Sequence, residues 1–171
     1  DVVNDIGALP DDANARACAA TGAALLIMHS VGQPKVPHTH VGYDDVLAVL
    51  DAFFAEKLAL ARAAGVAEEA LVLDPGIDFA KQRADNLRVF AGLRRLTRFG
   101  RPLLVVSRKT LIGEVLGLPL PAERDAGTVA CVVASQLRGG AIFRVHHARA
   151  AAEAVRTVAA VTSPAGGPAG R

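Results

Sequence analysis

The chain has 171 residues, of which 51% are hydrophobic and 21% charged, and its formal net charge is +2. This size and composition fit one domain with a hydrophobic core and exclude a disordered chain. The balanced charge argues against a nucleic-acid-binding protein, and no apolar run approaches the roughly 18 residues of a membrane span. The two cysteines, Cys18 and Cys131, lie far apart in the sequence and form no disulfide framework. We therefore expect a cytoplasmic protein.

Short apolar runs alternate with longer segments of helical periodicity. The apolar runs, typical of strands buried on both faces of a parallel sheet, are 1–6, 23–29, 70–74, 102–107 and 141–146. Helical spacing of apolar residues marks about 11–21, 43–64, 86–98, 108–116, 124–138 and 148–160. This order predicts an α/β protein, either an open doubly wound sheet or part of a (β/α)8 barrel. No GxGxxG follows the first strand, which disfavours the dinucleotide-binding version.

The ends of the chain carry two further expectations. The sequence begins at Asp1 inside an apparent strand, and its single methionine is Met28. Because a translation product begins with Met, we expect a piece of a longer protein. We assign 1–160 to one domain, and we expect the Gly- and Pro-rich tail 161–171 to be disordered.

Polar residues stand at or near the carboxyl end of each apolar run, where α/β proteins bind ligands. These residues are Asn4, Asp5, His29, Asp74, Ser107, Arg108, Lys109, Arg144 and His146. Asp74 could accept two N–H donors from a flat heterocycle, or it could cap the turn at Pro75 and Gly76. A hydrogen-bonded structural role is the commoner one for His29. Two loop histidines, His38 and His40, are a weak metal signal.

Cationic residues indicate an anionic ligand. Arg108 and Lys109 open a predicted helix, where acids are preferred, and this unfavourable choice favours ligand binding. Arg144 and His146 are two residues apart on one strand, so both face one way and suit a phosphate or diphosphate. They could instead pair with an internal carboxylate. Since no nucleophile–base pair is evident, the residues favour a transfer reaction that orients two substrates and stabilises a departing diphosphate.

The combination of motifs resembles the dihydropteroate synthase family. Along about residues 1–158 the matching segments are Val-Asn-Asp-Ile6, Ile-Met-His-Ser-Val-Gly-Gln-Pro34, Leu-Asp-Pro-Gly-Ile77 with Phe79 and Lys81, Ser-Arg-Lys109, and Arg-Val-His146. The resemblance implies a TIM barrel, of which the chain would hold about strands 4 to 8. It also implies a homodimer, for which 124–138 and 148–160 are the expected surfaces.

The resemblance further implies a transferase of folate biosynthesis. Such an enzyme condenses 6-hydroxymethyl-7,8-dihydropterin diphosphate with 4-aminobenzoate, usually with Mg2+, and releases diphosphate. By position, Asn4, Asp74 and Lys109 would hold the pterin, whose pocket Met28 would line. Arg144 and His146 would hold the diphosphate. Ser107 and the helix after it would take the aminobenzoate carboxylate, and Phe79 would lie against its ring. The implied catalytic residues are Lys109, Arg144 and His146, with Arg108 among the substrate-binding residues and no metal ligand in this chain.

The chain departs from the family pattern in three places. Asp78 stands where Gly is usual, His147 stands where Asp is common, and the strand before Ser107 is one residue short. A non-catalytic pterin-binding paralogue and a methyltetrahydrofolate–corrinoid methyltransferase therefore stay open as alternatives. Since Asp1 aligns with the start of the family's fourth strand, we expect this chain alone to be inactive and poorly soluble. Two sheet edges and an apolar concave face would be exposed.

Overall fold

A computed structural model describes residues 1–32, 41–104 and 107–163. The elements alternate as the sequence predicts: β1 (Val2–Asp5), α1 (Ala13–Thr21), β2 (Ala24–Met28), α2 (Val46–Ala63), β3 (Leu71–Asp74), α3 (Arg83–Leu96), β4 (Arg101–Leu104), α4 (Thr110–Leu116), α5 (Asp125–Gln136), β5 (Ile142–Phe143) and α6 (Ala148–Thr162). Short 3-10 turns lie at Glu68–Ala70, Thr97–Phe99 and Pro121–Arg124. His38 and His40, and part of the strand expected over 102–107, lie outside the described residues.

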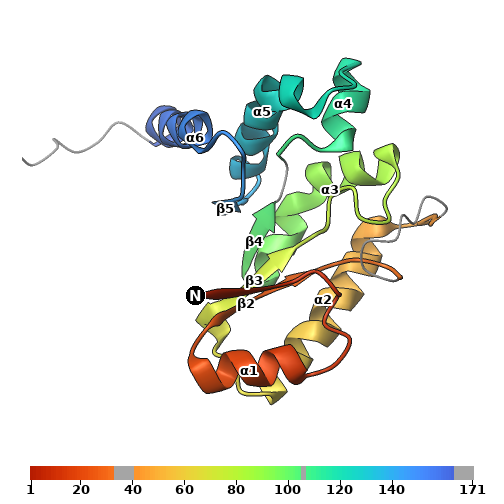
Figure 1. Cartoon of the computed structure of the whole chain (residues 1–171), viewed down its shortest axis with the longest axis vertical. Helices are drawn as coiled ribbons and strands as arrows, with labels where there is room; N and C mark the ends of the chain where they lie inside the picture. Colours follow the sequence, from red (N-terminus) through yellow and green to blue (C-terminus); the bar gives the residue numbers. More distant parts are fainter. Residues whose placement is uncertain (33–40, 105–106, 164–171) are drawn as a thin grey trace, which may run out of the picture.

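All pairings between the described strands are parallel, and the sheet order is β1-β2-β3-β4-β5. Figure 1 shows the strands following one another in chain order, with α1, α2 and α3 beside them. A doubly wound sheet reverses its strand order at a switch point, and the described strands show no such reversal. The topology therefore favours an arc of a barrel over the open doubly wound alternative.

The main core lies between the sheet and its helices. Side chains alternate along a strand, so Leu25 and Ile27 of β2 face the helices and are fully buried. Helix α2 presents Leu50, Phe54 and Leu58 to them at spacings of four residues, all fully buried. The Asp45 carboxylate caps this helix, because Oδ1 accepts the N–H groups of Leu47 and Ala48 at 2.9 and 3.0 Å.

The other face of the sheet carries a smaller cluster. Leu26, Met28 and Val72 pack together with Phe79 from the loop after β3. Because Leu26, Met28 and Val72 are at most 8% exposed, the expectation of an exposed apolar concave face is wrong for these side chains. The expected sheet edges are present, and Val2 on β1 and Ile142 on β5 are 60% and 40% exposed.

Helix α6 is the last element of the described residues. Helix α6 continues to Thr162, slightly past the predicted boundary at 160, and 164–171 lie outside the described residues. Among the described helices, none combines the length and apolar character needed to cross a membrane.

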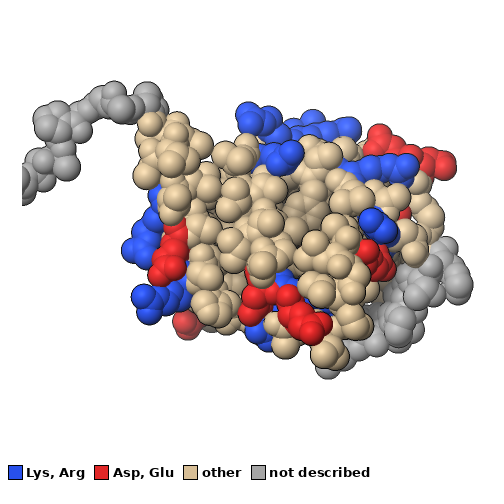
Figure 2. Space-filling view, turned by 90° about the horizontal axis from the view of Figure 1, so that it is seen from above, with Lys and Arg blue, Asp and Glu red and all other residues tan. Residues whose placement is uncertain are grey.

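The surface at the α4 and α5 end of the molecule combines uncharged and charged areas. Figure 2 views this end and shows a broad uncharged area, with Lys, Arg, Asp and Glu side chains gathered mainly around it. Cations and acids share its border, so this face presents no continuous basic stripe. The view agrees with the balanced charge of the sequence.

Candidate functional site

Asp74 ends β3 on the concave side of the sheet. The parallel register pairs Met28 with Asp74 and Asn4 with Leu26, which places Asn4 on the same face. Asn4 is exposed at the edge strand, whereas Asp74 is 2% exposed. Asp74 Oδ1 accepts the N–H of Gly76 at 2.7 Å. Burial raises the pKa of Asp74 to about 6, although this hydrogen bond and nearby lysines act in the opposite direction.

A buried lysine supports the loop after Asp74. Lys81 Nζ donates to His29 Nδ1 at 2.8 Å, to Gly76 O at 3.1 Å and to Phe79 O at 3.2 Å. Burial lowers the pKa of Lys81 to about 7 and that of His29 to about 3, so His29 is neutral near pH 7. The structural role expected for His29 is confirmed. No role was predicted for Lys81 from the sequence, where it appears only as part of a segment that matches the family.

Lys109 lies close to both Phe79 and Asp74. Its Nζ lies 4.4 Å from the centroid of the Phe79 ring, which is a cation–π contact. Burial lowers the pKa of Lys109, while the charges of Asp78 and Asp74 raise it. The structure therefore brings Lys109 close to both Phe79 and Asp74, three residues to which the family resemblance assigns substrate contacts.

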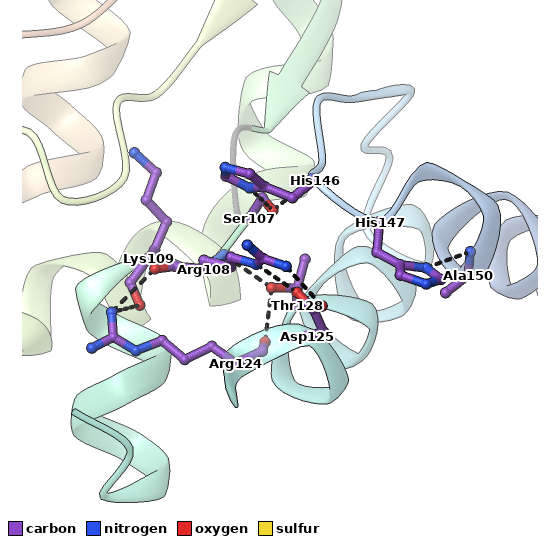
Figure 3. Close-up of polar contacts among 9 residues, drawn as sticks. All are labelled: Ser107, Arg108, Lys109, Arg124, Asp125, Thr128, His146, His147 and Ala150. Carbon is purple, nitrogen blue, oxygen red and sulfur yellow. Dashed lines mark hydrogen bonds and ion pairs between the residues drawn. The ribbon is translucent and has the colours of Figure 1, made fainter. Parts of the chain in front are cut away.

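A cationic pocket of about 290 Å³ lies beside Lys109. Its lining residues are Ser107, Lys109, Arg144, Val145 and His146. Since none of these lining residues carries a carboxylate, the pocket suits an anion. The expectation that Arg144 and His146 lie on one strand is wrong: β5 ends at Phe143, and both residues follow it in the segment that leads to α6. Figure 3 shows His146 turned toward Ser107, with Lys109 extending on the other side of the loop.

Ser107 is 9% exposed and links the segment after β4 to the segment after β5 through its contacts with His146. Its Oγ accepts the N–H of His146 at 2.9 Å and lies 2.6 Å from His146 Nδ1. Helix α4 begins only at Thr110, with Lys109 as its N-cap. The structure thus places Ser107 against His146 and not at the helix start, where the sequence analysis expected it to receive a carboxylate.

Arg108 points away from the pocket. Its Nε and Nη2 donate to the two carboxylate oxygens of Asp125 at 2.8 and 3.0 Å, and its N–H donates to Thr128 Oγ1 at 3.0 Å (Figure 3). Arg124 anchors the same loop by donating to the Arg108 and Lys109 carbonyls at 3.1 and 3.3 Å. The structure does not bring the Arg108 guanidinium to the site, because Asp125 on α5 holds it.

Both side-chain departures from the family motifs have hydrogen-bond partners. The Asp78 carboxylate accepts Leu111 N–H, with both oxygens at 3.3 Å, and Asn86 Nδ2–H at 3.0 Å. Asp78 has a φ of 65°, a left-handed conformation that Asp tolerates better than most residues. His147 is the N-cap of α6, where Nδ1 accepts the Ala150 N–H at 3.2 Å.

The described residues do not fit a metal centre. Within 1–32, 41–104 and 107–163, no three or more His, Cys, Asp or Glu side chains gather in a way that could hold an ion. The pocket beside Lys109 presents cations, which repel a divalent ion that lacks a bound anion.

Comparison with protein families gives a match over most of the chain. A family model described as pterin binding enzyme matches residues 1–146. The chain is 39% identical over 163 residues to the dihydropteroate synthase of Escherichia coli (strain K12), and 36% identical over 167 residues to that of Bacillus subtilis (strain 168). These alignments cover 95% and 96% of this chain. The chain spans 57% and 56% of the relatives' lengths, little more than half.

Solved structures show the same similarity. Dihydropteroate synthase from Stenotrophomonas maltophilia with active site-bound imidazole gives a TM-score of 0.91 at 34% identity, over 96% of this chain and 63% of that one. Dihydropteroate synthase from Thermus thermophilus in complex with 4-aminobenzoate gives a TM-score of 0.89 at 34% identity, over 95% of this chain and 66% of that one.

Proposed function

This chain belongs to the pterin-binding enzyme family, and we propose that it is the part of a dihydropteroate synthase that carries about strands 4 to 8 of a TIM barrel. The observation that carries the proposal is the position of Lys109. Its charge interacts with the buried Asp74 carboxylate, and it also lines the cationic pocket with Arg144 and His146. A ligand with a flat polar ring and a diphosphate needs these two features side by side.

The proposed reaction transfers a pterin-methyl group to an aromatic amine. The amine nitrogen of 4-aminobenzoate forms a bond to the methylene carbon of 6-hydroxymethyl-7,8-dihydropterin diphosphate, the C–O bond to diphosphate breaks, and the amine loses a proton. Asp74 accepts two N–H donors of the pterin ring, and Arg144, His146 and Lys109 stabilise the leaving diphosphate. Asn4 and Met28 complete the pterin pocket, and Phe79 lies against the aminobenzoate ring.

We propose a requirement for Mg2+ only because the family resemblance implies it. The described residues form no site for it, so we derive no step through the metal. Turnover of the full-length protein with and without a chelator tests the requirement. Loss of turnover that added Mg2+ restores supports a metal bound with the diphosphate.

We also propose that the protein is a cytoplasmic homodimer. An apolar groove of about 410 Å³ lies between α3, α4 and α5, with Phe90, Leu111 and Cys131 among its lining residues. Exposed Leu87, Val115 and Leu116 also line it. Such a surface favours association, and the sequence analysis expected the helix at 124–138 to take part. Sedimentation of the full-length protein distinguishes a dimer from a monomer.

The structural support for the two departures from the family pattern weakens the paralogue alternative. Asp78 and His147 each make hydrogen bonds that hold loops near the pocket, so neither leaves a damaged site. A methyltransferase needs no diphosphate site, whereas this chain has a pocket lined by three cationic or imidazole side chains. Both observations favour the synthase.

A turnover assay tests the proposed function. The full-length protein receives the dihydropterin diphosphate, labelled 4-aminobenzoate and Mg2+, and dihydropteroate is measured. We expect product from the wild type and a loss of at least about a hundredfold in Lys109→Ala and Arg144→Ala, since each removes a charge from the leaving group's site. Arg16→Ala, at an exposed position of α1 outside the expected dimer surfaces, is the matched control and keeps full turnover. Pterin binding without product would favour the paralogue.

A further inference from the structure

Ser107 has two contacts to one residue, and they impose a hydrogen-bond assignment. The backbone N–H of His146 can only donate, so Ser107 Oγ accepts it at 2.9 Å. The hydroxyl proton of Ser107 is then available for the second contact, to His146 Nδ1 at 2.6 Å. This assignment gives the Ser107 hydroxyl, His146 Nδ1 and the His146 backbone N–H each a partner.

The opposite assignment leaves a group without a partner. If Nδ1 carried the proton, both contacts would use Oγ as acceptor, and the Ser107 hydroxyl proton would need a third partner. Within the described residues Ser107 Oγ contacts no other polar group, and the residue is 9% exposed. A buried donor without a partner costs about 1–3 kcal/mol, which disfavours this arrangement.

We propose that Ser107 is a positioning residue that holds His146 as the tautomer with its proton on Nε2, and so aims an N–H donor at an anion in the pocket. The imidazole is exposed and lines the pocket with Arg144 and Lys109. With Nδ1 used by Ser107, Nε2–H is the ring's donor for a diphosphate oxygen. The role in the reaction rests on the proposed synthase function, whereas the tautomer rests on the Ser107–His146 geometry alone.

A positioning serine and a serine that binds the aminobenzoate carboxylate, as the family resemblance implies for Ser107, behave differently when they are replaced. A serine that binds the aminobenzoate carboxylate contacts substrate itself, and its loss raises the KM for 4-aminobenzoate. A serine that acts through His146 contacts no substrate, and its loss weakens diphosphate binding. The two roles therefore affect different ligands.

The tautomer is measured first, by two-bond 1H–15N correlation of the imidazoles in the full-length protein. We expect His146 to show a proton on Nε2 and an unprotonated Nδ1 in the wild type, and mixed tautomers in Ser107→Ala. Ser107→Thr keeps a hydroxyl and restores the wild-type pattern. A wild-type His146 with its proton on Nδ1 overturns the proposal, whether or not the protein has synthase activity.

Titration with inorganic pyrophosphate and Mg2+ tests the functional consequence. Ser107→Ala weakens pyrophosphate binding about tenfold, the effect of losing one well-aimed hydrogen bond. In a His146→Ala background the same substitution changes nothing further, because Ser107 then has no histidine to position. Ser135→Ala is the matched control, since this buried hydroxyl donates to Cys131 O at 2.6 Å within α5.

Two results contradict the positioning role. A tenfold loss in the His146→Ala background would mean that Ser107 contacts the anion itself. Unchanged pyrophosphate binding in Ser107→Ala with a raised KM for 4-aminobenzoate would return Ser107 to the carboxylate site. Failure of the synthase assay with the expected tautomer and pyrophosphate binding would remove the proposed reaction and leave the Ser107–His146 assignment intact.

Discussion

Gly76 is the tightest point beside the candidate site, and its replacement by alanine gives the sharpest prediction. A Cβ at this position would overlap the carbonyl oxygen of His29 and would lie 3.1 Å from its carbonyl carbon. Both are backbone atoms, so no side-chain rotation relieves the contact. The backbone φ of 68° adds a second cost, because alanine rarely adopts the left-handed region.

The magnitude follows from two parts. The left-handed conformation costs an alanine about 1 kcal/mol. The overlap forces the loop away from β2, which weakens the 2.7 Å hydrogen bond from Gly76 N–H to Asp74, worth about 1.5–3 kcal/mol when the acceptor is charged. We therefore expect Gly76→Ala to lower the free energy of unfolding by about 2.5–4 kcal/mol.

Gly22 supplies a matched control. Its φ is 70°, nearly that of Gly76, but a Cβ there would meet no atom of the described residues within 4 Å. Gly22→Ala should therefore cost only the conformational part, about 1 kcal/mol. Urea unfolding of the full-length protein, followed by circular dichroism, compares the two variants. Equal losses of stability in the two variants would mean that the close approach to the His29 carbonyl adds no cost.

Substitutions at Asp74, Arg124 and Asp78 test other residues around the candidate site. Asp74 has a folded-state pKa of about 6 and an ordinary value of 3.8, so its protonation stabilises the fold below pH 4 and this contribution is lost as the pH rises through 6. Urea unfolding at pH 4 and pH 7 should show that component in the wild type, and a pH dependence unchanged by Asp74→Asn would contradict it. Arg124→Ala removes the side-chain donor to the Leu118, Pro119 and Arg108 carbonyls and one of three donors to the Lys109 carbonyl, and should lower the free energy of unfolding by about 2–4 kcal/mol, with melting temperature as the readout. Asp78→Ala removes the acceptor of Leu111 N–H, so we expect a higher KM for the dihydropterin diphosphate with partial rescue by Asp78→Asn; an unchanged KM would separate this loop from the site.

The alternation of elements could be predicted because its causes are local. Continuous apolar runs mark strands buried on both faces, and α2 follows a clear helical spacing that places Leu50, Phe54 and Leu58 in the core. The helix begins at Val46 and not at 43, because Asp45 caps it there.

The site could be predicted only in part, because its residues act through contacts between distant segments. Their place at or near the ends of predicted strands was enough to predict that four residues lie near one another: Asp74, Lys109, Arg144 and His146. It could not reveal that Asp125, 17 residues away, draws Arg108 from the pocket, or that Ser107 meets a histidine 39 residues later. The burial of Lys81 could not be predicted either, since lysine is almost never fully buried without partners, and the side chain among its partners is His29, 52 residues away.

We propose that this chain helps to form a site that joins a dihydropterin to 4-aminobenzoate with loss of diphosphate. The most direct measurement follows both products of the full-length protein in one reaction. We expect one dihydropteroate formed for each diphosphate released, with no diphosphate release when 4-aminobenzoate is omitted. A folded protein that binds the pterin yet forms no dihydropteroate, or that releases diphosphate without needing the amine, would contradict it.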